Sequence, residues 1–143
     1  MWDNLRIGII GQGSQYKRIS KILRSLGISF KIYKPSSDSN YYNKEEFNKL
    51  KSCNAIFILS PNNTHLKYIE LLKDNRYLFC EKPPVNKIND LNKLKKIRSN
   101  KLYFNYNFRF SKISELLRET NKLNLNDLLY ASIITCLLYT SPS

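Results

Sequence analysis

The sequence has few of the residues that build metal sites or disulfide frameworks. Its 143 residues include one histidine and three cysteines, Cys53, Cys80 and Cys136, which lie far apart. No CxxC pair or Cys/His cluster is present, which argues against structural zinc and against a disulfide framework. We therefore expect no metal site and a reducing, cytoplasmic setting.

Long apolar runs are also missing. No stretch approaches the roughly 20 apolar residues that a membrane-spanning helix needs, and the first residues do not form a secretory signal. The hydrophobic share of 42% and the charged share of 24% are those of a soluble globular protein. The length fits one domain with a real core. We expect no membrane partner.

Acidic residues are scarce beside basic ones. The chain has 24 Lys and Arg against 11 Asp and Glu, a net charge of +13, and such a charge favours polyanions. The lysines are spread along the chain among asparagines and isoleucines, so a compositional drift explains them better than a nucleic-acid site does. We expect no nucleic-acid partner; a basic nucleic-acid-binding domain is an alternative for which only net charge speaks.

Only four glycines are present, and three of them lie in the most informative stretch, residues 6–16. The apolar run Ile7 to Ile10 predicts a strand that is buried on both faces. Gly11 and Gly13 then allow a sharp turn and a close approach of a ligand to the backbone. A helix from Ser14 would point its free N–H groups and positive dipole end at a phosphate. The alternative is an ordinary tight turn without a ligand.

The glycine pattern departs from the dinucleotide fingerprint at its third position, where Tyr16 stands. That position serves close packing of helix on strand, so the change affects local packing more than pyrophosphate binding. The second strand, predicted at 28–33, ends in Tyr33 and Lys34 without the acid that usually holds the adenosine ribose hydroxyls. The sequence therefore leaves the choice between NAD and NADP as the cofactor open.

The residues that follow this second predicted strand allow two interpretations. Lys34 together with Ser36 or Ser37 could meet a 2′-phosphate, which leans slightly toward NADP. Alternatively, Asp38 could curl back to hold the ribose, and Lys34 would be one of many surface lysines.

Strand and helix signals alternate along the rest of the chain. The further predicted strands are 54–60, 76–80, 102–106 and 127–135; the further predicted helices are 43–51, 66–73, 86–97 and one that begins at 113. Asn43 would cap its helix, with Phe47 and Leu50 inward. The helix 86–97 would turn an apolar stripe inward: Ile88, Leu91, Leu94 and Ile97. Such alternation predicts an α/β fold, a Rossmann-type doubly wound parallel sheet with helices on both faces.

Polar segments follow several of the predicted strands at their carboxyl ends, where ligands bind in such sheets. They are 60–65, the pair Glu81 and Lys82 on a turn made rigid by two prolines, and 107–110. His65 at a helix start is either a structural hydrogen bonder or a group that borders the ligand.

Four motifs occur together in the order of a known family: 9–18, 58–65, 80–83 and 106–110. With them, residues 5–135 resemble the N-terminal half of the Gfo/Idh/MocA family of NAD(P)-dependent oxidoreductases, which act mainly on sugars, cyclitols and nucleotide sugars. The chain departs from the family pattern at Tyr16, at the missing acid, and at Asn105, where the family usually has glycine.

The resemblance implies roles for individual residues. Lys82 would be the catalytic residue that orients substrate and cofactor and assists proton transfer, and its charge would stabilise a developing alkoxide. Arg109 would shape the crevice near the substrate. The expected cofactor-binding residues are Gly11, Gln12, Gly13, Ser14, Gln15, Tyr16, Tyr33, Lys34, Ser60, Pro61, Asn62, His65, Glu81, Lys82 and Arg109.

The resemblance also implies a domain plan. We expect a dinucleotide-binding domain at 1–125, the first strand of a truncated α+β substrate domain at 126–135, and a non-native tail at 136–143 that resembles translated adaptor read-through. In the family, the second domain supplies an Asp, a His and most of the substrate pocket, and it usually mediates assembly. The chain alone would bind cofactor without turnover of a small sugar-type substrate, and any homo-oligomer would form through the missing domain. The alternative is a non-catalytic nucleotide-binding or sensor protein of the same fold.

Overall fold

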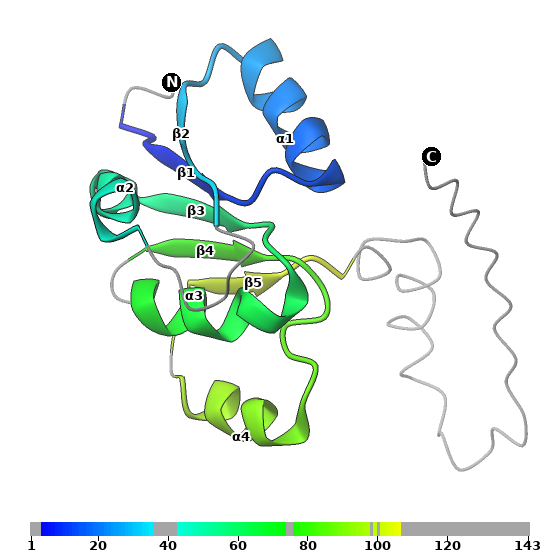
Figure 1. Ribbon diagram of the computed structural model, residues 1–143. Helices are drawn as coiled ribbons and strands as arrows, with labels where there is room; N and C mark the ends of the chain where they lie inside the picture. Colours follow the sequence, from blue (N-terminus) through cyan, green and yellow to red (C-terminus); the bar gives the residue numbers. More distant parts are fainter. Residues whose placement is uncertain (1–3, 36–42, 74–75, 98, 100, 107–143) are drawn as a thin grey trace, which may run out of the picture. The chain divides into compact units, whose positions relative to one another are not determined.

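The computed structural model describes residues 4–35, 43–73, 76–97, 99 and 101–106 (Figure 1). All of them belong to the first of the two units into which the chain divides, Met1–Tyr106. The predicted helix from 113, the strand 127–135, the tail 136–143 and Arg109 lie outside the described residues, and so do Ser36, Ser37 and Asp38.

The described residues form one parallel sheet. Its strands are β1 (Ile7–Ile10), β2 (Phe30–Tyr33), β3 (Ala55–Ile58), β4 (Tyr77–Cys80) and β5 (Leu102–Phe104). They lie in the order β2-β1-β3-β4-β5, and every neighbouring pair is parallel. β1 therefore has β2 on one side and β3 on the other, which is the point where a doubly wound sheet reverses its strand order and opens a crevice.

Helices follow the strands as the alternation predicts. They are α1 (Ser14–Ser25), α2 (Lys44–Asn48), the 3₁₀ turns η1 (Lys49–Ser52) and η2 (Asn62–Thr64), α3 (His65–Leu72) and α4 (Ile88–Lys96). The predicted cap of α2 is confirmed, because the Asn43 side chain accepts the backbone N–H of Glu46 at 3.1 Å. Phe47 and Leu50 are buried, also as predicted.

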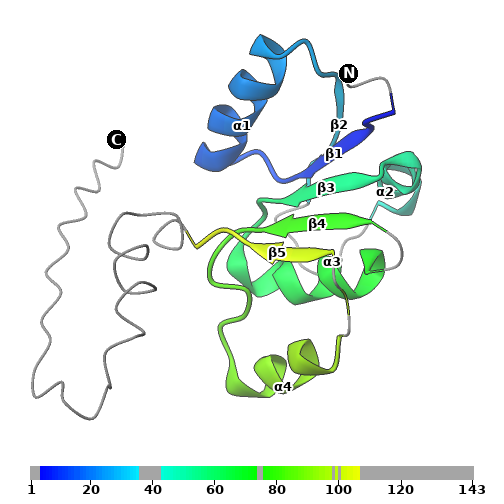
Figure 2. The ribbon, with the colours of Figure 1, turned by 180° about the vertical axis from the view of Figure 1, so that it is seen from behind.

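Among the described residues the core consists of two hydrophobic clusters, one on each face of the sheet. Figures 1 and 2 show the helices that flank the sheet. Leu23 of α1 packs with Ile7 and Ile9 in the smaller cluster. The larger cluster joins α2, α3 and α4 to the opposite face of the strands; its sheet residues include Ile10, Ile56, Ile58 and Leu78. Helices on both faces of a parallel sheet confirm the predicted fold class.

The inward stripe predicted for α4 is wrong in its first half. Ile88 is 80% exposed and Leu91 is 38% exposed, whereas Leu94 is buried and Ile97 is partly buried. The reason is that α4 reaches the larger cluster only through its C-terminal half. The helical period was therefore read correctly, but the length over which α4 contacts the core was not.

Gly11 lies where the turn after β1 passes against the turn after β3. Its φ is 103°, and a Cβ at this position would lie 2.6 Å from the carbonyl oxygen of Leu59. The Gly11 N–H donates to the Tyr33 carbonyl at 2.9 Å, and the Leu59 N–H donates to the Ile10 carbonyl at 2.8 Å. These contacts hold the carboxyl ends of three strands together.

We predict that Gly11→Ala lowers the free energy of unfolding by about 3 kcal/mol or more, because a strained φ and a backbone clash act together. Gly27→Ala is the matched control: Gly27 also has a positive φ of 68°, but a Cβ there would meet nothing within 4 Å. Its expected cost is about 1–2 kcal/mol. Chemical denaturation measures the free energy of unfolding of both variants. Equal small losses would show that the turn after β1 can move away from the turn after β3 to make room for the new Cβ.

Candidate functional site

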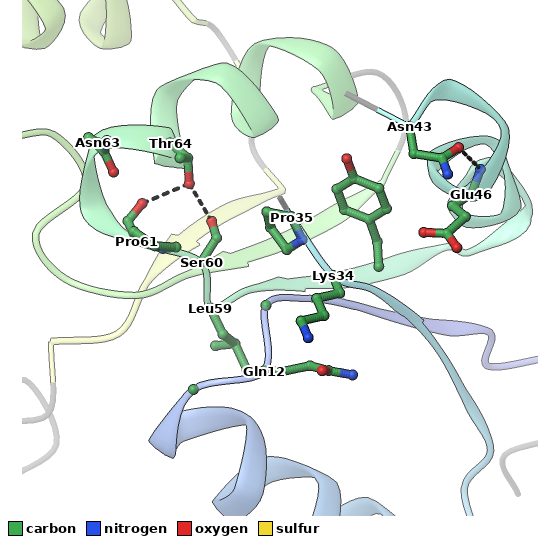
Figure 3. A pocket seen from close by; sticks show the side chains of 13 residues that line it. Gln12, Lys34, Pro35, Asn43, Glu46, Leu59, Ser60, Pro61, Asn63 and Thr64 are labelled. Carbon is green, nitrogen blue, oxygen red and sulfur yellow. Dashed lines mark hydrogen bonds between the residues drawn. The ribbon is translucent and has the colours of Figure 1, made fainter. Parts of the chain in front are cut away.

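A pocket of about 990 Å³ opens at the carboxyl ends of β1, β2 and β3 (Figure 3). Segments from these three strand ends and from α2 and η2 line it: Gly11, Gln12, Gly13, Tyr33, Lys34, Pro35, Asn43, Glu46, Leu59, Ser60, Pro61, Asn63 and Thr64. The pocket thus lies at the reversal of strand order, where the fold predicts a ligand.

Seven of the predicted cofactor-binding residues line this pocket, and seven others among the described residues do not. Those present are Gly11, Gln12, Gly13, Tyr33, Lys34, Ser60 and Pro61. Those among the described residues that do not line it are Ser14, Gln15, Tyr16, Asn62, His65, Glu81 and Lys82. Asn63 lines the pocket where Asn62 was expected.

The glycine turn and the start of α1 form one wall of the pocket. Gly13 is the N-cap of α1 in extended conformation, no side chain caps the helix, and its first turn holds no acid. The free N–H groups of this twelve-residue helix are therefore open to an anion. A Cβ on Gly13 would meet nothing within 4 Å, so the fold itself does not require glycine here.

Tyr16 stands at the position of the third fingerprint glycine, and its side chain packs against β2. Its ring makes an edge contact with Phe30 of β2, with ring centroids 6.5 Å apart, and it joins the smaller core cluster. The aromatic pair thus contributes to the packing of α1 on the sheet, and Tyr16 is not among the residues that line the pocket.

The opposite wall comes from the end of β2 and from α2. The Tyr33 ring is only 1% exposed and meets Phe47 edge-on at 5.3 Å. Lys34 continues the strand toward the pocket, and Asn43 and Glu46 reach it from α2 (Figure 3). Sequence reasoning identified Asn43 only as a helix cap and did not identify Glu46; the Asn-x-x-Glu spacing at the start of α2 was the available signal.

The third wall is the turn after β3. Ser60 is buried, and the Thr64 hydroxyl lies 2.7 Å from both the Ser60 Oγ and the Pro61 carbonyl oxygen (Figure 3). These contacts close the turn onto η2. Polar side chains of Ser60 and Thr64 thus meet the pocket in a fixed arrangement.

His65 is fully buried beneath this turn. Its Nε2 lies 2.8 Å from the Ser60 carbonyl oxygen and its Nδ1 lies 2.9 Å from the Pro83 carbonyl oxygen. A neutral imidazole can donate to one of the two carbonyls, and a doubly protonated ring can donate to both. The geometry favours the structural hydrogen bonder of the two alternatives, since the ring joins the turns after β3 and β4.

Glu81 and Lys82 follow β4, the next strand along the same sheet edge. The Glu81 side chain is buried; its Oε1 accepts the Asn105 Nδ2 at 2.6 Å and its Oε2 accepts the Lys82 backbone N–H at 3.2 Å. The Lys82 side chain is exposed. The motif therefore consists of a fixed carboxylate and an adjacent ammonium open to solvent.

Cys80 ends β4 directly before this pair. Its thiol is buried, and burial, reinforced by the negative charge of Glu81, raises its pKa to about 12. Cys53 is also free and buried, and burial raises its pKa too. Neither thiol is placed to act as a nucleophile.

Within the described ranges, no three metal-ligating side chains gather into a possible metal site. In the same part of the chain, no helix has the length and apolar content that crossing a membrane requires. The cytoplasmic setting stays a prediction from cysteine usage.

Comparison with known proteins identifies the class of this fold and site. Residues 16–106 match the Gfo/Idh/MocA oxidoreductase family, described as an oxidoreductase family with an NAD-binding Rossmann fold. The chain therefore belongs to this family, and its cofactor class is that of the nicotinamide dinucleotides. No curated protein matched the sequence.

Two solved structures have the same fold. One is UDP-N-acetylglucosamine 3-dehydrogenase GnnA from Acidithiobacillus ferrooxidans, with 15% identity and a TM-score of 0.62 over 81% of this chain and 43% of that chain. The other is an oxidoreductase from Sinorhizobium meliloti, with 20% identity and a TM-score of 0.61 over 84% of this chain and 42% of that one. The chain thus spans less than half the length of these proteins.

The double contact of His65 predicts a structural role that can be separated from ligand binding. His65→Leu should lower the free energy of unfolding by about 1–3 kcal/mol, because it removes the ring N–H that one of the buried carbonyls accepts and the polar contact with the other. Denaturation and a cofactor titration of the same variant measure the two effects. Unchanged stability with weakened cofactor binding would instead make His65 a ligand contact.

The raised pKa of Cys80 predicts a loss of stability at alkaline pH. The thiol ionises in the unfolded chain near pH 9 but in the folded chain near pH 12. Stability is therefore undiminished below pH 9 and falls above it by up to about 1.4 kcal/mol per pH unit. Between pH 8 and 10.5, the free energy of unfolding should fall more steeply with pH for the natural chain than for Cys80→Ala. Parallel slopes for the two proteins would contradict this prediction.

Proposed function

We propose that this chain is the cofactor-binding domain of an oxidoreductase that transfers hydride between a nicotinamide cofactor and a hydroxyl or carbonyl group of a sugar, cyclitol or nucleotide sugar. One observation carries the proposal: the pocket at the strand reversal is walled by an uncapped helix start and by Gly13, whose Cβ position is empty. A pyrophosphate fits such a wall, because it gains N–H donors and the helix dipole without meeting a side chain.

The nicotinamide end of the cofactor would extend along the sheet edge toward the turn after β4. Lys82 there carries an exposed ammonium, while Glu81 is fixed by Asn105. The cofactor supplies the hydride chemistry. Lys82 would orient the substrate hydroxyl and stabilise the negative charge on its oxygen while the hydride passes to the nicotinamide and the hydroxyl proton passes to a base of the second domain.

A sugar-type substrate is what the resemblance to the family implies. One structural relative is a UDP-N-acetylglucosamine 3-dehydrogenase. At 15% identity that likeness carries the fold and not the substrate. In the family, a second domain supplies most of the substrate pocket and mediates assembly. We therefore expect this chain to bind cofactor without turnover.

The proposal predicts that Gly13→Val weakens binding of reduced dinucleotide at least tenfold, because the new side chain would project where the pyrophosphate lies. The fold should tolerate the change, since no atom lies within 4 Å of the Cβ position. Fluorescence titration with NADH and NADPH measures the affinities, and thermal unfolding checks the fold. Gly27→Ala, remote from the pocket, serves as the control. Unchanged affinity would mean that the glycine turn is not the pyrophosphate site.

A further inference from the structure

The wall formed by β2 and α2 carries two opposite charges. Lys34 follows the end of β2, and Glu46 comes from the first turn of α2; both line the pocket (Figure 3). The described residues at the end of β2 include no acid. A carboxylate is nevertheless present at this wall, and it arrives from a different element.

The position of Glu46 is set by the core and not by a loose loop. Phe47, the next residue, is 2% exposed, meets the Tyr33 ring at 5.3 Å and stacks on the Tyr68 ring at 5.9 Å. Asn43 fixes the Glu46 backbone by accepting its N–H. Because Phe47 is packed into the core, it sets the orientation of α2 that places Glu46 at the pocket.

Both charged side chains are available to a ligand. Within the described part of the chain, the structure gives neither the Glu46 carboxylate nor the Lys34 ammonium an ion pair or a hydrogen bond; the ion pair that it does record there joins Lys93 to Asp90. A carboxylate without a protein partner can accept hydrogen bonds from two neighbouring hydroxyls at once.

We propose that Glu46 receives the 2′- and 3′-hydroxyls of the adenosine ribose, and that it makes this chain prefer NAD over NADP. The proposal rests on the proposed function, since it takes the pocket to be the dinucleotide site. A 2′-phosphate would remove one hydroxyl donor and place about two negative charges beside the carboxylate, which is strongly unfavourable. Lys34 alone favours NADP; Glu46 reverses that preference.

The test compares Glu46→Gln with Glu45→Gln in the full chain. Glu45 is the adjacent acid of the same helix turn, exposed and outside the pocket lining. The two variants have the same net charge, so they differ only in which carboxylate is lost. NADH and NADPH are titrated separately into each, and thermal unfolding confirms that both variants remain folded.

The natural chain should bind NADH at least tenfold more tightly than NADPH. Glu46→Gln should weaken the binding of NADH, strengthen the binding of NADPH through Lys34, and shift the ratio of the two affinities at least tenfold. Glu45→Gln should leave this ratio unchanged. Adding Lys34→Met to Glu46→Gln should remove the gain for NADPH.

Three results would overturn the proposal. One is a natural chain that prefers NADPH, and another is an unchanged ratio in Glu46→Gln. The third is a ratio that shifts in Asp38→Asn and not in Glu46→Gln, which would assign the ribose to the other acid. In these cases the chain still binds dinucleotide and the proposed function stands. Binding of neither cofactor would overturn both.

Discussion

The pocket depends on one close approach of two backbones. The turn after β1 lies so near the turn after β3 that a single Cβ on Gly11 would stand 2.6 Å from the Leu59 carbonyl oxygen. Backbone hydrogen bonds from Gly11 to Tyr33 and from Leu59 to Ile10 join the same strand ends. Three walls of the pocket begin within a few residues of these contacts. Its shape is therefore set by the sheet, and the loops add side chains to a frame that is already fixed.

Two buried polar side chains connect the ends of the next strands by further hydrogen bonds. His65 joins the turn after β3 to the turn after β4 through two carbonyls, and Glu81 joins β4 to the residue that follows β5. The second contact explains a departure from the family pattern: Asn105 stands where glycine is usual, and its amide satisfies a buried carboxylate. Burying that carboxylate without a donor would be costly. The Lys82 ammonium needs no part in this support and stays exposed.

Local patterns in the sequence were sufficient for the strands and helices of the described residues and for the glycine turn, because apolar periodicity and turn chemistry act over a few residues. They were not sufficient where contacts between elements that are distant in the sequence determine the position of a side chain. The first half of α4 has the right period but extends past the core, so Ile88 is exposed. Tyr33 ends β2 as expected, yet its ring is buried by Phe47 and Tyr68. Glu46 was missed because the Asn-x-x-Glu spacing indicates only the start of α2, whereas the place of Glu46 at the pocket depends on how Phe47 packs α2 against the core.

The balance between Lys34 and Glu46 shows why local geometry outweighs overall charge here. A net charge of +13 would by itself attract the more highly charged NADP. At physiological ionic strength, however, exposed charges are largely screened beyond about 8 Å, so most of the lysines contribute little at the ribose. Among the described residues, the charges that line the pocket are one ammonium and one carboxylate, and in the proposed arrangement they determine the preference. Of these two, the carboxylate also accepts hydrogen bonds from the unmodified diol, so in the proposed arrangement it both attracts NAD and repels NADP.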